Sequence, residues 1–129
     1  MLLVNRVMRN GLVEVEVDPK ILCEPCRFDI FLVTLDPTKG SEIKKTRPCI
    51  IISPDELNHT LSTIIVAPMT TTIRSYPTRV LLTLDDKKGQ VALDQIRTLD
   101  KSRLVKKLGR ASKPVQKRIL ETLISLFSE

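Results

Sequence analysis

Short apolar runs separated by polar turns recur along most of this chain. The first three are residues 30–35, 49–53 and 63–67, and each has the length and composition of a β-strand. The run 49–53 is almost wholly apolar, which predicts a strand buried on both faces. Residues 78–84 alternate between apolar and polar types, as a half-buried fourth strand does. The pattern therefore favours a fold built mainly from strands.

Polar segments connect these strands and introduce shorter ones. Residues 70–77 are expected to form a polar loop, and the segment 85–89 predicts a turn. The remaining strand candidates are residues 90–93, 96–99 and 105–108. Strands this short, following one another closely, predict a small and strongly bent sheet or a partly open barrel.

Two segments have helical signals. Ser53, Pro54, Asp55 and Glu56 predict the start of a short helix that ends near Asn58. Residues 113–127 form the one long helix expected, with Ser112 as its cap. Its apolar residues recur at helical spacing: Val115, Ile119, Leu120, Leu123, Ile124 and Phe127. The predicted fold class is mainly β with α (α+β), a small SH3-like barrel with a C-terminal helix.

The first 26 residues differ from the rest. Residues 12–17 alternate apolar and acidic side chains, and Asn10-Gly11 predicts a hairpin turn just before them. Three bases and four acids give this segment a net charge of −1, whereas the whole chain carries +6. We expect residues 1–26 to be an N-terminal extension, in part a β-hairpin, and residues 27–129 to form one domain.

The positive charge is concentrated toward the C-terminus. The tract 101–118 holds eight lysines and arginines and no acid. Such a surface favours a polyanionic partner such as nucleic acid, although a solvated basic face without a ligand has the same composition. With three Phe, one Tyr and no Trp, an RNA ligand would be held mainly by charge and hydrogen bonds.

The three cysteines favour a reducing cytoplasm over a disulfide framework, and no targeting signal or membrane span is visible. Cys23 and Cys26 form a single Cys-x-x-Cys pair. One such pair without a second is weak support for zinc, and two incidental thiols are the plainer interpretation. We expect no metal and no cofactor.

The residues 36–48 join two strand candidates and combine three lysines, one arginine and Glu42. With His59 as the only histidine, a two-histidine nuclease mechanism is excluded. The acidic pairs 55–56 and 85–86 belong to a helix start and a turn, so they are poor candidates for a metal site. A metal-free site of arginine, threonine and carboxylate remains. It suits RNA, because the 2′-hydroxyl of RNA supplies the nucleophile.

Three residues are the candidates for this chemistry. Arg47 has a planar fork that can hold two phosphoryl oxygens, although an ion pair with Glu42 is its plainer role. Thr70 follows an apolar run and can donate to the same phosphate, or it can only satisfy its own backbone. Glu42 is a candidate base whose three neighbouring lysines lower its pKa and so weaken that role.

Three separated motifs, at residues 36–48, 66–70 and 94–100, resemble those of MazF/PemK-type toxins. The similarity extends over residues 27–128. It implies a dimeric, metal-independent endoribonuclease that cuts single-stranded RNA at short sequences and is neutralised by an acidic, MazE-like antitoxin. It also implies catalytic roles for Arg47, Thr70 and Glu42. Beside them we expect the RNA-binding residues to be Lys39, Ser41, Lys44, Lys45, Thr71, Arg74, Tyr76, Gln95 and Arg97.

The sequence departs from the family pattern in two places. Phe28 stands where these toxins usually have glycine. In the Kid-like branch, a histidine, an arginine and an aspartate are implicated in catalysis. Here Ser41 and Ala92 stand in place of the histidine and the arginine, and only the aspartate, Asp94, is left. Two alternatives stay open: a non-enzymatic toxin that binds gyrase, as CcdB-type toxins of similar fold do, and a domain that binds RNA without cutting it.

Overall fold

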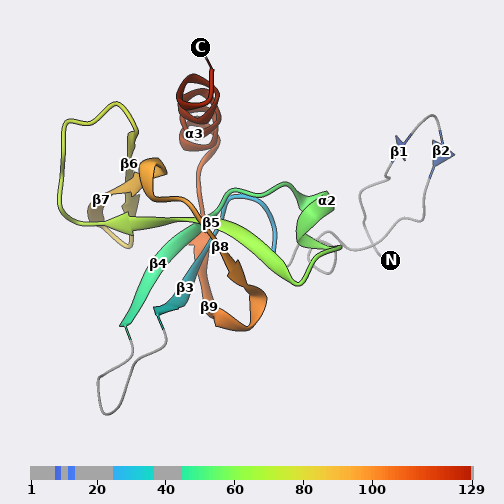
Figure 1. Ribbon diagram of the computed structural model, residues 1–129. Helices are drawn as coiled ribbons and strands as arrows, with labels where there is room; N and C mark the ends of the chain where they lie inside the picture. The colour runs from blue at the N-terminus through green and yellow to red at the C-terminus, as the bar shows by residue number, and fades with distance from the viewer. Residues whose placement is uncertain (1–7, 10–11, 14–24, 37–44, 129) are drawn as a thin grey trace.

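In the computed structural model, which describes residues 8–9, 12–13, 25–36 and 45–128, an antiparallel sheet occupies the centre (Figure 1). Its strands are β3 (Asp29–Asp36), β4 (Lys45–Ile51), β5 (Thr63–Thr70), β6 (Arg79–Leu84), β7 (Lys87–Ala92), β8 (Arg97–Asp100) and β9 (Leu104–Arg110). Their order is β6-β7-β5-β4-β3-β9, and β8 also pairs with β5. The prediction of a mainly β fold is confirmed.

The long strand β5 gives the sheet its bend. Its first residues pair with β8 on one side, Thr63 lying opposite Asp100, and its middle pairs with β4. Its last two residues, Met69 and Thr70, pair with β7 instead. One strand therefore belongs to both halves of a curled sheet, as the predicted bent barrel requires.

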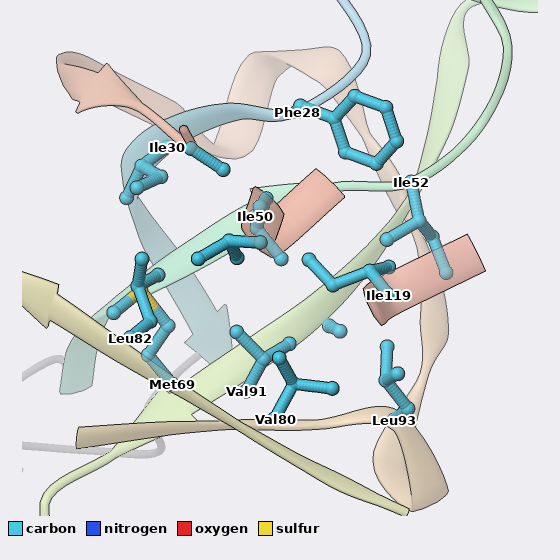
Figure 2. Close-up of a cluster of buried hydrophobic side chains, with 13 residues drawn as sticks. Phe28, Ile30, Ile50, Ile52, Met69, Val80, Leu82, Val91, Leu93 and Ile119 are labelled. Atoms are coloured by element: carbon cyan, nitrogen blue, oxygen red, sulfur yellow. The ribbon is translucent and has the colours of Figure 1, made fainter. Parts of the chain in front are cut away.

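The two faces of β4 and β5 pack into two separate apolar clusters. Figure 2 shows the first, in which Ile50, Met69 and Phe28 lie together with Ile119 of the C-terminal helix. The second cluster lies on the opposite face and includes Cys49, Ile51, Val66 and Leu99. Residues 49–53 are all buried, so the predicted burial of this run on both faces is confirmed.

The C-terminal helix α3 (Lys113–Leu126) has Ser112 at its N-cap, as predicted, although the serine side chain makes no capping hydrogen bond. Val115 and Ile119 are buried in the first cluster. The expected apolar face does not stay covered to its end, because Ile124 is 67% exposed and Phe127 is 72% exposed. The second half of α3 projects beyond the sheet (Figure 1).

Several element boundaries differ from those expected. The strand β5 continues through Thr70, which the sequence placed in a loop. Only Asp85 and Asp86 form the turn after β6, both with positive φ, and β7 begins at Lys87. This is the two-residue hairpin geometry, which carboxylates and amides tolerate better than other side chains.

The short helices also need one correction. Helix α2 (Asp55–Asn58) has Pro54, not Ser53, at its N-cap. The Ser53 hydroxyl donates to Asn58 Oδ1 at 2.5 Å and accepts from the Ile65 amide at 3.0 Å, so it links the helix to β5. Two 3₁₀ turns complete the fold, η1 (Leu93–Gln95) and η2 (Lys101–Arg103).

In the N-terminal segment, β1 (Met8–Arg9) pairs antiparallel with β2 (Leu12–Val13). The rest of the expected hairpin and Cys23 lie outside the described residues, and the division of the chain after residue 26 stays a prediction. Within the described part, no helix is both long and apolar enough to cross a membrane.

Phe28 has a left-handed backbone, with φ of 74°, at the position where the sequence comparison expects glycine. This conformation costs a residue with a Cβ about 1–2 kcal/mol. The buried Phe28 ring offsets that cost, because truncating such a ring typically loses about 3–5 kcal/mol.

We therefore expect Phe28→Gly to lower the free energy of unfolding by about 3 kcal/mol, although it relieves the backbone. Urea unfolding of the two proteins measures this change. Phe28→Leu, which keeps an apolar side chain, is expected to lose less. Equal or greater stability of the glycine variant would show that backbone strain outweighs the buried ring.

Candidate active site

Arg47 and Thr70 lie on neighbouring strands. Cys49 of β4 is paired with Pro68 of β5. Arg47 lies two residues before Cys49 and Thr70 two residues after Pro68, and because the strands are antiparallel both lie toward the same end of the sheet. Because side chains alternate along a strand, two positions return both residues to one face. Together they line a hollow of about 190 Å³. The structure thus brings the two leading catalytic candidates to one place.

The described lining of this catalytic hollow contains three arginines and no carboxylate. Its residues are Arg47, Pro68, Thr70, Thr72, Arg74, Arg79, Ala92 and Gln95. Arg74 and Gln95 were predicted from the sequence to bind RNA. A small cavity with this charge is suited to an anion, and phosphate is the anion that arginine forks hold best.

The Thr70 hydroxyl has a defined orientation. Thr70 Oγ1 accepts a hydrogen bond from the Thr72 amide at 3.1 Å. The Thr70 side chain thus binds the local backbone, as the alternative interpretation expected, but this hydrogen bond uses only a lone pair of its oxygen. The hydroxyl proton stays available for a ligand oxygen.

The neighbouring strand β7 approaches the Thr70 backbone closely. A Cβ at Gly89 would lie 2.8 Å from the Thr70 carbonyl oxygen. Only glycine allows this approach without a shift of one strand. Gly89 therefore helps to set the position of Thr70.

A buried glutamine holds the loop that carries Arg74. The Gln90 side chain accepts from the Arg74 amide and donates to the Arg74 carbonyl, both at 2.9 Å. Gln90 is 4% exposed, so these bonds are shielded from water. The sequence analysis missed Gln90, because its role depends on the pairing of β5 with β7.

Arg79 was also missed, although it lines the catalytic hollow. Its Nε donates to Asp94 Oδ1 at 2.8 Å, and its guanidinium lies 5.0 Å from the centre of the Tyr76 ring. The hydrogen bond from Arg79 lowers the pKa of Asp94 and raises that of the arginine. Thr78 Oγ1 donates to the same carboxylate at 2.9 Å. Arg79 also lies directly opposite Ala92.

The other predicted site residues are placed as follows. Thr71 and Tyr76 are exposed on the loop that follows β5 and do not line the hollow. Arg97 donates to the Leu35 carbonyl oxygen at 3.4 Å, near the end of β3. Lys45 is the first residue of β4. Lys39, Ser41, Glu42 and Lys44 lie outside the described residues, and their roles stay predictions.

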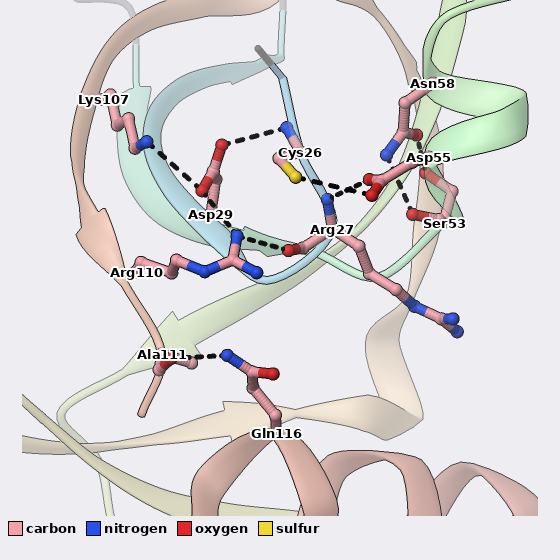
Figure 3. A network of polar contacts seen from close by, with 10 residues as sticks. All are labelled: Cys26, Arg27, Asp29, Ser53, Asp55, Asn58, Lys107, Arg110, Ala111 and Gln116. Atoms are coloured by element: carbon pink, nitrogen blue, oxygen red, sulfur yellow. Dashed lines mark hydrogen bonds and ion pairs between the residues drawn. The ribbon is translucent and has the colours of Figure 1, made fainter. Parts of the chain in front are cut away.

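Part of the basic tract 101–118 has structural partners. Arg110 Nη1 and Lys107 Nζ lie 3.1 and 3.4 Å from the buried carboxylate of Asp29 (Figure 3). Arg103 donates to the Thr34 and Leu35 carbonyls. These three bases stabilise the sheet edge, so the charge of the tract overstates the surface that is free for a polyanion.

The thiol of Cys26 lies 3.5 Å from Asp55 Oδ2, and Oδ1 of the same carboxylate accepts a hydrogen bond from the Arg27 amide at 2.7 Å (Figure 3). No group of three potential metal ligands is found among His, Cys, Asp and Glu of the described residues. The Cys-x-x-Cys pair cannot be judged from Cys26 alone, because Cys23 is outside that part.

Cys49 lies two residues from Arg47, and burial raises the pKa of its thiol to about 12 despite the charges of Arg47 and Arg97. Because the thiolate is the nucleophile, we expect iodoacetamide at pH 8 to leave Cys49 unmodified in the native protein and to modify it in urea. Mass-spectrometric peptide mapping checks this. Native labelling as fast as in urea would contradict it.

The raised pKa also predicts a pH dependence. The unfolded chain releases the Cys49 proton near the ordinary value of 9.0, and the folded one near 12. The contribution of this thiol to stability is therefore complete below pH 9 and decreases as the pH rises toward 12.

A larger hollow of about 700 Å³ lies between β6 and α3 and shares Arg79 with the catalytic hollow. Its lining has two arginines, Arg79 and Arg118, and also the carboxylate of Glu121, so it lacks the purely positive charge found around Arg47. The smaller space is the candidate for the chemistry, because it combines the Thr70 hydroxyl with three guanidinium groups. Such a combination can stabilise a phosphorane without a metal.

The curled sheet with a C-terminal helix is the fold of a class of small bacterial toxins, and the comparisons with known proteins give the family. Residues 26–127 match the model of the PemK-like, MazF-like toxins of type II toxin–antitoxin systems, and the chain belongs to this family. It is 39% identical over 99 residues to the endoribonuclease MazF of Staphylococcus saprophyticus, covering 72% of this chain and 82% of that protein.

Solved structures agree with this assignment. MazF from Deinococcus radiodurans matches with a TM-score of 0.64 and 27% identity, covering 78% of this chain and 93% of that one. A mycobacterial endoribonuclease in complex with its cognate antitoxin matches with a TM-score of 0.65 and 27% identity, over 77% and 90% of the two chains.

Proposed function

We propose that this protein is the toxin of a type II toxin–antitoxin pair and cuts single-stranded RNA at short sequences without a metal ion. The observation that carries the proposal is the convergence of Arg47 and Thr70, from two neighbouring strands, on one arginine-lined hollow. The family supports the same reaction, since its relative from Staphylococcus saprophyticus is named an endoribonuclease.

In the proposed reaction, the 2′-oxygen of the nucleotide before the cut attacks the adjacent phosphorus. Its proton passes to a base, for which Glu42 is the candidate, and the 5′-oxygen of the next nucleotide leaves and takes up a proton. The products are a 2′,3′-cyclic phosphate and a 5′-hydroxyl. Arg47 stabilises the charge that develops on the phosphoryl oxygens, and the Thr70 hydroxyl donates to one of them.

The test is incubation of the purified protein with a long single-stranded RNA in EDTA. We expect cuts at a few recurring sequences and cyclic phosphates at the new 3′ ends. A matched oligonucleotide with a single 2′-deoxy nucleotide before the cut is expected to stay whole, because it lacks the nucleophile. Cleavage of that deoxy substrate would reject the mechanism.

The rival functions give different results in the same assay. A gyrase-binding toxin leaves the RNA intact and inhibits DNA supercoiling by gyrase. A plain RNA-binding domain also leaves it intact and still retards it in a gel. The Arg47–Thr70 pair favours cleavage, because neither rival needs a guanidinium and a fixed hydroxyl in one hollow.

The proposal includes an acidic antitoxin, which would compete with RNA for the same basic surface, and a cytoplasmic reaction. It also includes a homodimer. Apolar side chains at the C-terminal end of the chain's last helix stay exposed in this protomer: Ile124, Leu126 and Phe127. Exposed apolar groups gathered in one region are typical of a protein interface.

We expect the double variant Ile124→Ser, Phe127→Ser to sediment as a monomer at concentrations at which the unmodified protein is a dimer. Ile73→Ser is the matched control, because Ile73 is 53% exposed in a different region, the loop after β5. Loss of the dimer in the control alone would place the interface elsewhere.

A further inference from the structure

We propose that Arg79 binds a phosphate of the RNA in the catalytic hollow, and that Asp94 and Tyr76 hold its guanidinium in position for that contact. The inference rests on the proposed function, because it takes RNA as the ligand. It adds a binding residue that the sequence motifs do not contain, together with the two groups that orient it.

The position of Arg79 in the sheet brings it to the hollow. It begins β6 and lies directly opposite Ala92 of β7. Paired residues share a face of the sheet, so the short Ala92 side chain leaves room on that face for the long one of Arg79. Both residues line the hollow that contains Arg47 and Thr70. Arg79 therefore reaches the site from a strand that carries none of the predicted residues.

The guanidinium of Arg79 is held in a fixed orientation. Nε and Nη2 of Arg79 donate to the two oxygens of Asp94, at 2.8 and 3.4 Å. The Tyr76 ring covers the group at 5.0 Å, and the Arg79 side chain is only 7% exposed. These two groups limit its motion, which reduces the entropy that binding would otherwise cost.

Part of the hydrogen-bonding capacity of the Arg79 guanidinium stays unused. A guanidinium has five N–H donors, and Asp94 uses two of them. Nη1 donates no hydrogen bond to any residue of the described ranges 25–36 and 45–128. This nitrogen can therefore donate to a phosphate oxygen in the hollow.

The salt dependence of RNA binding tests the contact directly. The probe is an oligonucleotide with a 2′-deoxy nucleotide at the cut, which binds and stays whole. For single strands, each phosphate contact contributes about 0.7 to the slope of log K against log salt. We expect Arg79→Ala to reduce that slope by about 0.7 and to weaken binding about 10- to 100-fold at low salt.

Lys87→Ala is the matched control. It removes one positive charge from the other end of the same hairpin, where Lys87 pairs with Leu84. We expect this variant to keep the slope of the unmodified protein. Equal slopes for Arg79→Ala and the unmodified protein would overturn the proposal.

Two further variants test the positioning. Asp94→Asn makes the protein more positive by one charge, so general electrostatics predicts tighter binding. We expect weaker binding with an unchanged slope, because Arg79 keeps its charge and loses its fixed orientation. Tighter binding by Asp94→Asn would reject the role of Asp94.

The double variant Arg79→Ala, Ala92→Arg places an arginine on the paired strand, opposite the original position. We expect it to restore the slope of the unmodified protein.

Circular dichroism establishes that each variant is folded. If Arg79→Ala does not fold, Arg79→Lys replaces it. Lysine keeps the charge but not the planar fork of arginine, so this variant is expected to keep the slope and to bind RNA several-fold more weakly. Unchanged affinity would overturn the proposal.

The outcomes of the binding experiments are independent of the cleavage test. Uncut RNA rejects the proposed function, whereas an unchanged slope rejects only the role of Arg79.

Discussion

Replacing Arg47 with alanine is expected to lower the rate of RNA cleavage by a factor of about 100 to 1,000, or about 2.7–4 kcal/mol in the activation free energy. The reason is that Arg47 lies on β4, the strand next to the one that carries Thr70, and shares the hollow with the Thr70 hydroxyl. Single-turnover cleavage of a short RNA, with protein in excess, measures the rate of the chemical step.

Arg47 is exposed, so its removal is not expected to change the free energy of unfolding beyond about 0.5 kcal/mol. Arg47→Lys separates charge from geometry. Lysine keeps the positive charge but cannot hold two oxygens at once, and we expect it to recover only part of the rate. An alanine variant that cuts RNA within tenfold of the normal rate would remove Arg47 from the mechanism.

A large loss of stability is also expected from Asp29→Ala. Asp29 is completely buried and accepts from the Cys26 amide at 2.9 Å and from Arg110 Nη1 at 3.1 Å, with Lys107 Nζ at 3.4 Å (Figure 3). Removing one member of a buried charged network typically costs about 3–5 kcal/mol. The two basic partners are partly exposed and can return to water. We therefore expect a loss near 3 kcal/mol in urea unfolding.

Asp29→Asn refines this prediction. The asparagine oxygen can still accept from the Cys26 amide, so the loss should be smaller than for alanine. Glu121→Ala is the control for charge, since Glu121 is an exposed carboxylate on α3. If Asp29→Ala and Glu121→Ala are equally stable, the network around Asp29 makes no net contribution to folding.

The sequence predicted the fold well, because local patterns determine it. The buried run at residues 49–53 and the helix after Ser112 are recognisable from periodicity and capping residues alone. The end of β5 was missed at Thr70 for a physical reason. The segment Thr70–Thr72 is polar like a loop, and only pairing with Gln90 of β7, a contact between distant segments, extends the strand.

The site was predictable only in part for the same reason. Arg47 and Thr70 carry local motif signals. Arg79 and Gln90 have none, because their roles arise from register. Arg79 reaches the hollow through its pairing with Ala92, and Gln90 reaches Arg74 across the start of a loop. The sequence shows that Phe28 replaces the usual glycine, but it does not show that Phe28 adopts a left-handed backbone.

The attachment of the loop 71–77 makes it suitable for engineering. All seven of its residues are exposed, and Gln90 holds the loop through the backbone N–H and carbonyl of Arg74, which every residue other than proline can supply. Side chains there can therefore be exchanged without loss of the anchor. A library randomised at Thr71, Ile73 and Ser75 should yield folded proteins of nearly uniform stability, from which toxins with new target sequences can be selected.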